Sequence, residues 1–337
     1  MSTDTLTTSI PAAGTPIIRL HQLTKKYGDF TAVNALSLDI YPGEVFGLLG
    51  PNGAGKTTTI LMMLGLAEPT SGEASICGLD PARSALQVKR KVGYLPDDVG
   101  FYEDRTAEDN LVYTARLNRI PLREARRRAA ELLQRVGLDG HGNQKVGSFS
   151  RGMRQRLGLA DVLIKQPEVI ILDEPTLGID PEGVRELLQL ISALSRDEGL
   201  TVLLSSHHLH QVQQICDRVG LFVQGQLIAS GNVAELSRQL DGDKHVYVEL
   251  TAQPWTEELA WTIRELDGVT GLQYASAAAG EEPGATAPVV TIVCDRDVSS
   301  HIAGAVIAAG ASLSYIRKKD YGLEEIYHHY FERREGE

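Results

Sequence analysis

Short apolar runs alternate with helical patterns over most of the chain, from residue 17 to about residue 230. The runs at 169–172, 202–204 and 219–223 contain no polar residue, which is typical of strands buried on both faces of a parallel sheet. The alternation predicts the α/β class, with a mainly parallel sheet flanked by helices. Residues 1–16 are rich in Ser, Thr, Ala and Pro, and we expect a disordered tail there.

The pattern becomes helical almost throughout between residues 102 and 146. Charged and apolar residues recur at a spacing of three to four in 108–117 and again in 122–136. This predicts a helical subdomain at about residues 98–150, inserted into a sheet domain that spans about residues 17–240.

A second unit is expected at residues 244–337, as a small α+β accessory domain. Its pattern reads strand, helix, strand, strand, helix, strand at 245–250, 255–266, 269–274, 289–293, 298–309 and 311–316. This βαββαβ order predicts a ferredoxin-like fold. We expect a flexible hairpin loop over 275–288 and an amphipathic helix over 323–334 at the end of the chain.

Length, charge and cysteine content limit the number of domains, the kinds of partner and the cellular compartment. The 337 residues favour two domains, and the net charge of −11 argues against a nucleic-acid-binding surface. Cys77, Cys216 and Cys294 are far apart and lack the spacing of a disulfide framework or metal site, which favours a reducing cytosol. Neither a signal peptide nor a run long enough to span a bilayer is present, so any membrane crossing is expected from another chain.

The segment 50–57 carries the clearest chemistry, since it reads Gly-Pro-Asn-Gly-Ala-Gly-Lys-Thr between a predicted strand at 44–49 and a predicted helix at 57–64. This is a phosphate-binding loop, whose backbone N–H groups surround a triphosphate. Lys56 adds a cation for the β- and γ-phosphates, and Thr57 offers a hydroxyl to Mg²⁺. The expected nucleotide-binding residues here are Gly50, Pro51, Asn52, Gly53, Ala54, Gly55, Lys56, Thr57 and Thr58.

Two carboxylates follow the apolar run 169–172. Ligands of open α/β sheets bind beyond the carboxyl ends of the strands, where Asp173 and Glu174 are expected to emerge. Asp173 is predicted to join Thr57 in the Mg²⁺ shell, and Glu174 to polarise an attacking water. The alternative is an ordinary surface turn, which the loop at 50–57 disfavours.

With these motifs in order, residues 17–235 resemble the ATP-binding subunits of ABC transporters. The segment 149–156 reads Phe-Ser-Arg-Gly-Met-Arg-Gln-Arg where that family has its signature, commonly Leu-Ser-Gly-Gly-Gln. Ser150 and Gly152 match, whereas Arg151 and Met153 depart. The signature needs a serine hydroxyl and N–H groups at a helix N-terminus, which Ser150 and Gly152 supply. A serine that only caps a helix is the alternative, and it is compatible with this role.

The resemblance implies further site residues. Tyr27 stands where an aromatic ring stacks on adenine, although a packing role is the alternative. Asp180 belongs to the loop through which subunits communicate, and His207 is the switch histidine that contacts the γ-phosphate. Lys56, Glu174 and His207 are thus the implied catalytic residues. His207, His208 and His210 could suggest a metal site, but we expect no carboxylate or cysteine to join them nearby, so no metal site is predicted there.

One departure concerns the glutamine loop of the family, which is expected at 94–97 and has Asp97 in the glutamine position. A carboxylate there can still accept from a Mg²⁺-bound water, so Asp97 is counted among the metal-site residues. This residue, the irregular signature and the segment 323–327 resemble the exporter branch called ABC-2 type.

The resemblance implies an ATP- and Mg²⁺-dependent ATPase that is cytoplasmic and peripheral on the inner face of the cell membrane. Each ATP would lie between the loop of one subunit and the signature of another, in a homodimer or with a paired ATPase subunit. The helical subdomain would dock a separate integral-membrane permease. The alternatives are a soluble ABC-type ATPase acting on nucleic acid or ribosomes, disfavoured by the acidic charge and single phosphate loop, and an importer ATPase, which predicts glutamine at position 97. The accessory domain would regulate the ATPase or brace the dimer.

Overall fold

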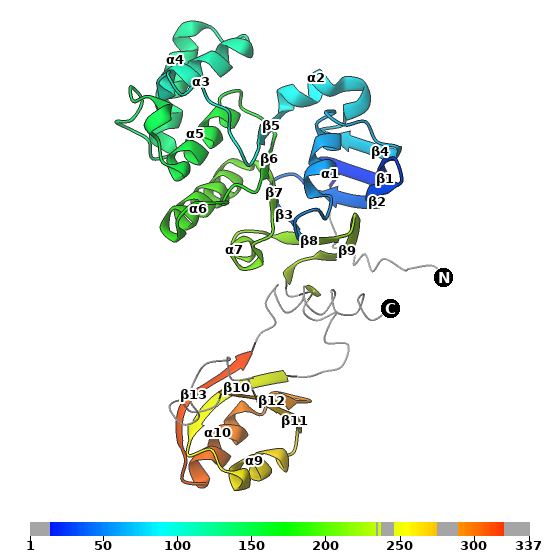
Figure 1. Ribbon diagram of the computed structural model, residues 1–337, viewed down its shortest axis with the longest axis vertical. Helices are drawn as coiled ribbons and strands as arrows, with labels where there is room; N and C mark the ends of the chain where they lie inside the picture. The colour runs from blue at the N-terminus through cyan, green and yellow to red at the C-terminus, as the bar shows by residue number, and fades with distance from the viewer. Residues whose placement is uncertain (1–13, 234, 237–245, 275–288, 320–337) are drawn as a thin grey trace. The chain divides into compact units, whose positions relative to one another are not determined.

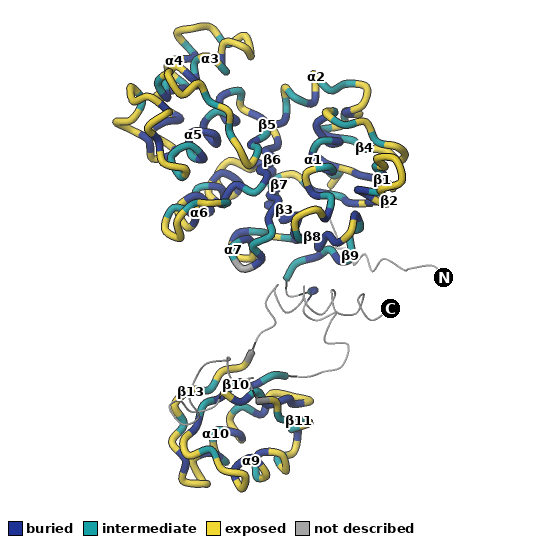
Figure 2. The backbone as a smooth tube through the Cα atoms, viewed as in Figure 1, coloured by how far each residue is buried: buried dark blue, intermediate teal, exposed yellow. Residues whose placement is uncertain are grey.

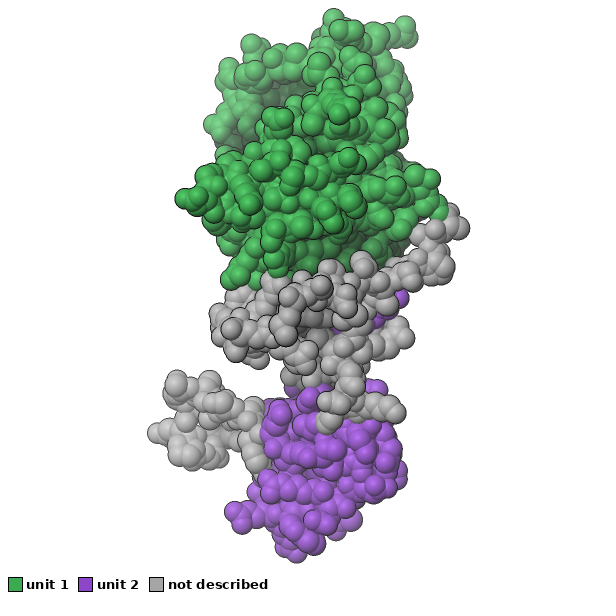
Figure 3. All heavy atoms as spheres, turned by 90° about the vertical axis from the view of Figure 1, so that its right-hand side faces the viewer, with its two compact units in different colours: residues 1–233, 330–337 green, residues 234–329 purple. Residues whose placement is uncertain are grey.

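The structure is a computed structural model that describes residues 14–233, 235–236, 246–274 and 289–319. The described residues form two compact units, one ending at residue 233 and the other beginning at residue 235 (Figure 3). Most of the predicted tail, the predicted loop at 275–288 and the predicted helix at 323–334 lie outside the described residues.

A six-stranded sheet forms the centre of the first unit, in the order β5-β6-β7-β3-β8-β9 (Figure 1). All neighbouring pairs are parallel except β8 and β9. Every residue of β3 and β6 is buried, because helices cover both faces of a parallel sheet (Figure 2). The predicted α/β class is therefore confirmed. The strands are β3 Val45–Leu49, β5 Val92–Leu95, β6 Val169–Asp173, β7 Thr201–Ser206, β8 Arg218–Val223 and β9 Gln226–Gly231.

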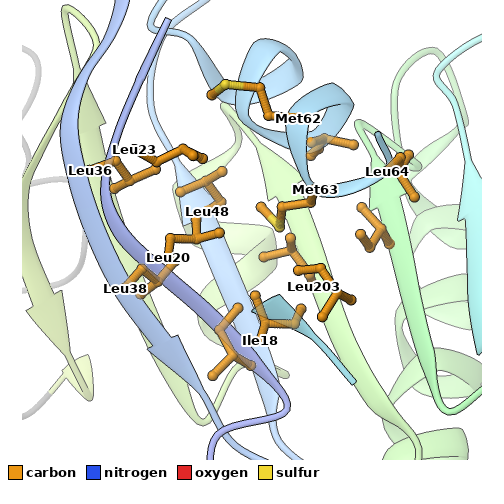
Figure 4. Packing of buried hydrophobic residues seen from close by; sticks show 14 of the residues in the cluster. Ile18, Leu20, Leu23, Leu36, Leu38, Leu48, Met62, Met63, Leu64 and Leu203 are labelled. Carbon is orange, nitrogen blue, oxygen red and sulfur yellow. The ribbon is translucent and has the colours of Figure 1, made fainter. Parts of the chain in front are cut away.

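A second, antiparallel sheet of the same unit has the order β2-β1-β4, from β1 Ile18–Tyr27, β2 Phe30–Ile40 and β4 Ser71–Ile76. Helix α1, Lys56–Met63, lies close to both sheets, and its Met62 and Met63 are buried. They belong to one core cluster with Leu48 of the large sheet and Leu20 of the small one (Figure 4). This packing anchors the helix that follows the predicted phosphate loop.

The helical region contains α3 Ala107–Leu117, α4 Leu122–Arg135 and α5 Arg151–Leu163. The prediction of an almost continuous helical pattern was wrong after Arg135, because residues 138–150 form turns and one short 3-10 helix, Val146–Ser148. Gly137 and Gly140 adopt φ values of 71° and 80°, left-handed conformations that end a helix. The remaining helices of this unit are α2 Pro81–Lys91, α6 Pro181–Glu198 and α7 Leu209–Gln213.

The second unit has the predicted βαββαβ order. Its strands pair antiparallel in the order β11-β12-β10-β13, the arrangement of a ferredoxin-like sheet. Leu259 and Ile263 of α9 pack with Ile302 and Val306 of α10 in one core cluster with the inward residues of the strands. The elements are β10 Val246–Gln253, α9 Glu257–Arg264, β11 Val269–Tyr274, β12 Val289–Cys294, α10 Ser299–Ala308 and β13 Ser312–Lys319.

Among the described helices, none combines the length and the apolar character that crossing a membrane requires.

Candidate functional site

The loop between β3 and α1 requires glycine at two positions. A Cβ atom on Gly50 would lie 2.1 Å from the carbonyl oxygen of Phe222, which no side chain tolerates. Gly55 has φ of 103°, and a Cβ atom there would lie 2.3 Å from the carbonyl oxygen of Ala32. The backbone therefore curls tightly between β2 and β8, and it can present successive N–H groups to an anion at the start of α1.

Lys56 is buried at the base of this loop, with 5% of its surface exposed. Its Nζ donates to the carbonyl oxygens of Gly50 at 2.7 Å and Pro51 at 3.2 Å. The same Nζ lies 3.2 Å from Oε1 of Glu174. The carbonyl contacts hold the ammonium group inside the loop, where it can neutralise phosphate oxygens.

Asp173 ends β6 and accepts two hydrogen bonds from hydroxyl groups. Thr57 Oγ1 donates to its Oδ2 at 2.9 Å, and Ser205 Oγ of the neighbouring strand β7 donates to its Oδ1. Burial raises the pKa of Asp173, and the bonds from Ser205 and Thr57 oppose that rise. A carboxylate and a hydroxyl side by side supply the oxygen ligands that a hard divalent cation prefers.

Glu174 faces His207 just beyond the ends of the same two adjacent strands, β6 and β7. Its Oε2 lies 2.9 Å from Nδ1 of His207, and its side chain is 12% exposed. The backbone of Glu174 has φ of 49°, a left-handed conformation that is strained for a residue with a side chain. This turn directs the carboxylate toward Lys56 and His207, where it can act as a general base.

Lys56, Glu174 and His207 line one cavity of about 520 Å³. Its walls include the loop from Pro51 to Thr58, together with Asp97, Glu174 and His207. Asp97 Oδ1 accepts from the backbone N–H of Asp98 at 2.8 Å, and its carbonyl oxygen accepts from Nε2 of Gln155 in α5 at 3.3 Å. The cavity thus brings together most of the predicted loop residues with Glu174 and His207, which directly follow β6 and β7, whereas Gly50 and Asp173 are not part of its lining.

The aromatic residue at this cavity is Phe30, which the sequence analysis did not single out. Tyr27 is not among the lining residues. It is 52% exposed and holds Nζ of Lys25 at 4.9 Å from its ring centroid. Tyr27 and Phe30 pair directly across the turn between β1 and β2. Both rings are therefore candidates for stacking on the adenine base. The only sequence signal for Phe30 was its place three residues after Tyr27.

Ser150 and Gly152 line a different hollow, of about 220 Å³, together with Asp180. Ser150 caps α5 by accepting from the N–H of Met153 at 3.2 Å, and Asp180 caps α6 by accepting from the N–H of Gly183 at 3.3 Å. The capping alternative for Ser150 is thus observed, and its hydroxyl still lies at a helix N-terminus. In the described part of one chain, the cavity lined by the phosphate loop does not include these residues.

His208 is a second residue that the sequence analysis left without a role. Its ring lies 3.9 Å from the ring of His207, centroid to centroid, and burial followed by the neighbouring His207 lowers its pKa. Glu174 stands beside both rings. The expectation that no carboxylate accompanies these histidines was therefore wrong, because residues 174 and 207 meet only through the pairing of β6 with β7.

Comparison with known proteins agrees with this geometry. Residues 33–177 match the family model described as "ABC transporter". The chain is 37% identical over 250 residues to the linearmycin resistance ATP-binding protein LnrL of Bacillus subtilis, covering 74% of this chain and 79% of that protein. It is 42% identical over 212 residues to the bacitracin transport ATP-binding protein BcrA of Bacillus licheniformis, covering 63% and 68%.

A solved structure is similar over the first unit. It is the dimeric ATP-binding cassette MJ0796 in a post-hydrolysis state with ADP and Pi, with a TM-score of 0.59 and 25% identity. The similarity covers 64% of this chain and 98% of that one.

Proposed function

This chain belongs to the ABC transporter family as an ATP-binding subunit with ATPase activity, and on that premise we propose that it powers export through a separate membrane-spanning permease. The relatives named for linearmycin resistance and bacitracin transport support the exporter branch over an importer. Asp97 in place of the glutamine expected of importers points the same way.

The observation that carries the arrangement is the separation of two hollows within one chain. Lys56 and the loop line one, and Ser150 and Gly152 line the other. Two copies related by a two-fold axis bring the loop of each copy to the signature of its partner, which gives two complete nucleotide sites. We propose such a dimer, formed with a second copy or a paired ATPase subunit, and the dimeric relative with ADP and Pi supports it.

The site residues fit hydrolysis of a nucleoside triphosphate. The loop and Lys56 hold the phosphates, and Thr57 and Asp173 offer the oxygen ligands for Mg²⁺, which neutralises phosphate charge when bound. Glu174 Oε2 accepts the proton of the attacking water, and His207 keeps that carboxylate oriented while its ring faces the γ-phosphate position. Phe30 of the cavity wall or the neighbouring Tyr27 would stack on the base, and Asp97 would accept from a water of the Mg²⁺ shell.

The helical region offers a docking surface for the permease. Tyr113 and Leu117, one turn apart on α3, are 47% and 67% exposed, and Tyr102 packs edge-on against Tyr113 with ring centroids 5.2 Å apart. Contiguous exposed apolar side chains often mark a protein interaction site. We propose that this patch places the subunit on the cytoplasmic face of the membrane.

A pull-down tests the proposal. Tagged Glu174→Gln protein is recovered with Mg-ATP from detergent-solubilised native membranes, and its partners are identified by mass spectrometry. A polytopic membrane protein in stoichiometric yield is expected, and Leu117→Ser should weaken its recovery. Leu86→Ser, at a leucine of α2 that is 76% exposed, should not. Recovery of only a dimer without a membrane protein, or of ribosomes or DNA, would support a non-transport ATPase instead.

A further inference from the structure

Three side chains beside the catalytic cavity form a donor set that ATP hydrolysis does not explain. Glu174, His207 and His208 each offer one ligand atom, and these three atoms lie within 4.8 Å of one another. Glu174 and His207 have roles in the proposed reaction, whereas His208 does not line the cavity. The proposed reaction therefore does not explain why the His208 ring lies beside Glu174 and His207.

His208 has an unused ring nitrogen. Its Nδ1 is buried, and among the described residues no hydrogen-bond partner faces it. Its backbone N–H donates to Oγ of Ser206 at 2.9 Å, which fixes the chain where β7 ends. A buried nitrogen of this kind normally finds a donor, an acceptor or a metal ion.

The spacing suits a transition metal. Zn²⁺ binds imidazole nitrogen and carboxylate oxygen at about 2.0–2.2 Å, so neighbouring ligand atoms of a tetrahedral site lie about 3.3 Å apart. The distance from Glu174 Oε2 to His207 Nδ1 is 2.9 Å, and all three ligand atoms lie within 4.8 Å of one another, a range that includes that value. These separations are therefore compatible with ligands that share one ion.

We propose that the nucleotide-free subunit binds one Zn²⁺-like transition-metal ion through Glu174, His207 and His208, and that this ion inhibits ATP hydrolysis. Two imidazoles with one carboxylate are a donor set typical of zinc, whereas Mg²⁺ prefers oxygen ligands throughout. Glu174 and His207 both line the cavity, so an ion can reach them from solvent.

The ion pair between Lys56 and Glu174 leaves one carboxylate oxygen of Glu174 available to a metal ion. Nζ of Lys56 lies 3.2 Å from Oε1 of Glu174, and it also donates to the carbonyl oxygens of Gly50 and Pro51. Oε2 is the other carboxylate oxygen, and it faces the nitrogen atoms of His207. The carboxylate can therefore keep its contact with Lys56 through Oε1 while Oε2 binds the ion.

Inhibition follows from the identity of the ligands. The ion would occupy Oε2, the oxygen that must accept the proton of the attacking water, and would fix the ring of His207 away from the phosphate. The ion would also bind the electron pair that the Glu174 carboxylate needs in order to act as a general base. ATP binding through the loop can persist, but hydrolysis cannot.

The test uses the full-length, metal-free chain without nucleotide. Calorimetry with Zn²⁺ measures affinity and stoichiometry, and the visible absorption of Co²⁺ reports tetrahedral nitrogen and oxygen ligation. Loss of a second-shell partner alone costs about 10- to 100-fold in metal affinity, so His208→Gln should raise the dissociation constant at least about tenfold. His301→Gln, an exposed histidine of the second unit, is the matched control and should leave binding unchanged.

Activity gives the second readout. His208→Gln should hydrolyse Mg-ATP at the wild-type rate in zinc-free buffer but need at least about tenfold more Zn²⁺ for half inhibition. Glu174→Gln should also lose Zn²⁺ binding while it still binds ATP, which separates the metal site from the nucleotide site. Equal Zn²⁺ affinity in the wild type and His208→Gln, or Zn²⁺ bound at one per chain without inhibition, would overturn the proposal.

Discussion

Asp161 makes the stability of the first unit depend on pH. This residue of α5 is partly buried, its enclosed Oδ1 has no hydrogen-bond partner among the described residues, and burial raises its pKa to about 6 against the opposing effects of Thr114 and Lys165. A carboxyl whose pKa is raised on folding stabilises the protein below its unfolded pKa, 3.8, and that contribution is lost as the pH rises through about 6. At 1.36 kcal/mol per pKa unit, the loss amounts to about 3 kcal/mol at neutral pH.

Replacing Asp161 with Asn removes the charge and keeps the shape. Relative to the wild type, Asp161→Asn should therefore gain stability at pH 7.5, and about 2 kcal/mol of that gain should disappear at pH 4.5. Urea unfolding followed by circular dichroism measures this difference. Both tryptophans, Trp255 and Trp261, lie in the second unit, so their fluorescence is an internal reference that should not change.

Asp197→Asn, which removes an exposed carboxylate from α6, is the control and should show no such pH dependence. A stability difference between Asp161→Asn and the wild type that is the same at both pH values, or larger at pH 4.5, would refute the raised pKa of Asp161 as its cause.

Three further predictions concern the site. Glu174→Gln should retain ATP binding, trap the dimer and release phosphate about 10²- to 10⁴-fold more slowly, and rapid phosphate release would contradict the role of the base. Gly50→Ala should abolish ATP binding measured with a fluorescent analogue, whereas Gly304→Ala, with open space around its Cβ position, should have no effect. Ser205→Ala removes a hydrogen bond that lowers the pKa of Asp173, so the acid limb of the ATPase pH profile should move to higher pH. An unchanged acid limb would show that Asp173 does not limit activity there.

The phosphate loop could be predicted from sequence because its chemistry is local. The loop 50–57, strand β3 and helix α1 are contiguous, and their residue types follow from the turn, the burial and the helix start. The second unit was predictable for a related reason, since strand alternation and helix spacing each extend over short segments. β13 runs to Lys319, beyond the predicted end at residue 316, because its polar residues pair with β10 at a sheet edge, where apolar patterning is weak.

Contacts across the sheet could not be predicted. Ser205 bonds to Asp173, and Glu174 stands beside His208, only because β6 and β7 are adjacent and parallel. The choice between Tyr27 and Phe30 also depends on a turn whose side-chain directions the residue types do not determine. The end of the helical pattern after Arg135 had a sequence signal in the glycines at 137 and 140, which apolar spacing alone conceals.

The separate hollows of the loop and of Ser150 have a genetic consequence under the proposed pairing. A homodimer of chains with an inactive phosphate loop has no working site, and neither has a homodimer of chains with an inactive signature. A mixed pair differs, because the intact loop of one chain meets the intact signature of the other and one site survives. Two inactive alleles, such as Gly50→Ala and a signature substitution at Ser150, are therefore expected to complement each other partially when expressed together in one cell.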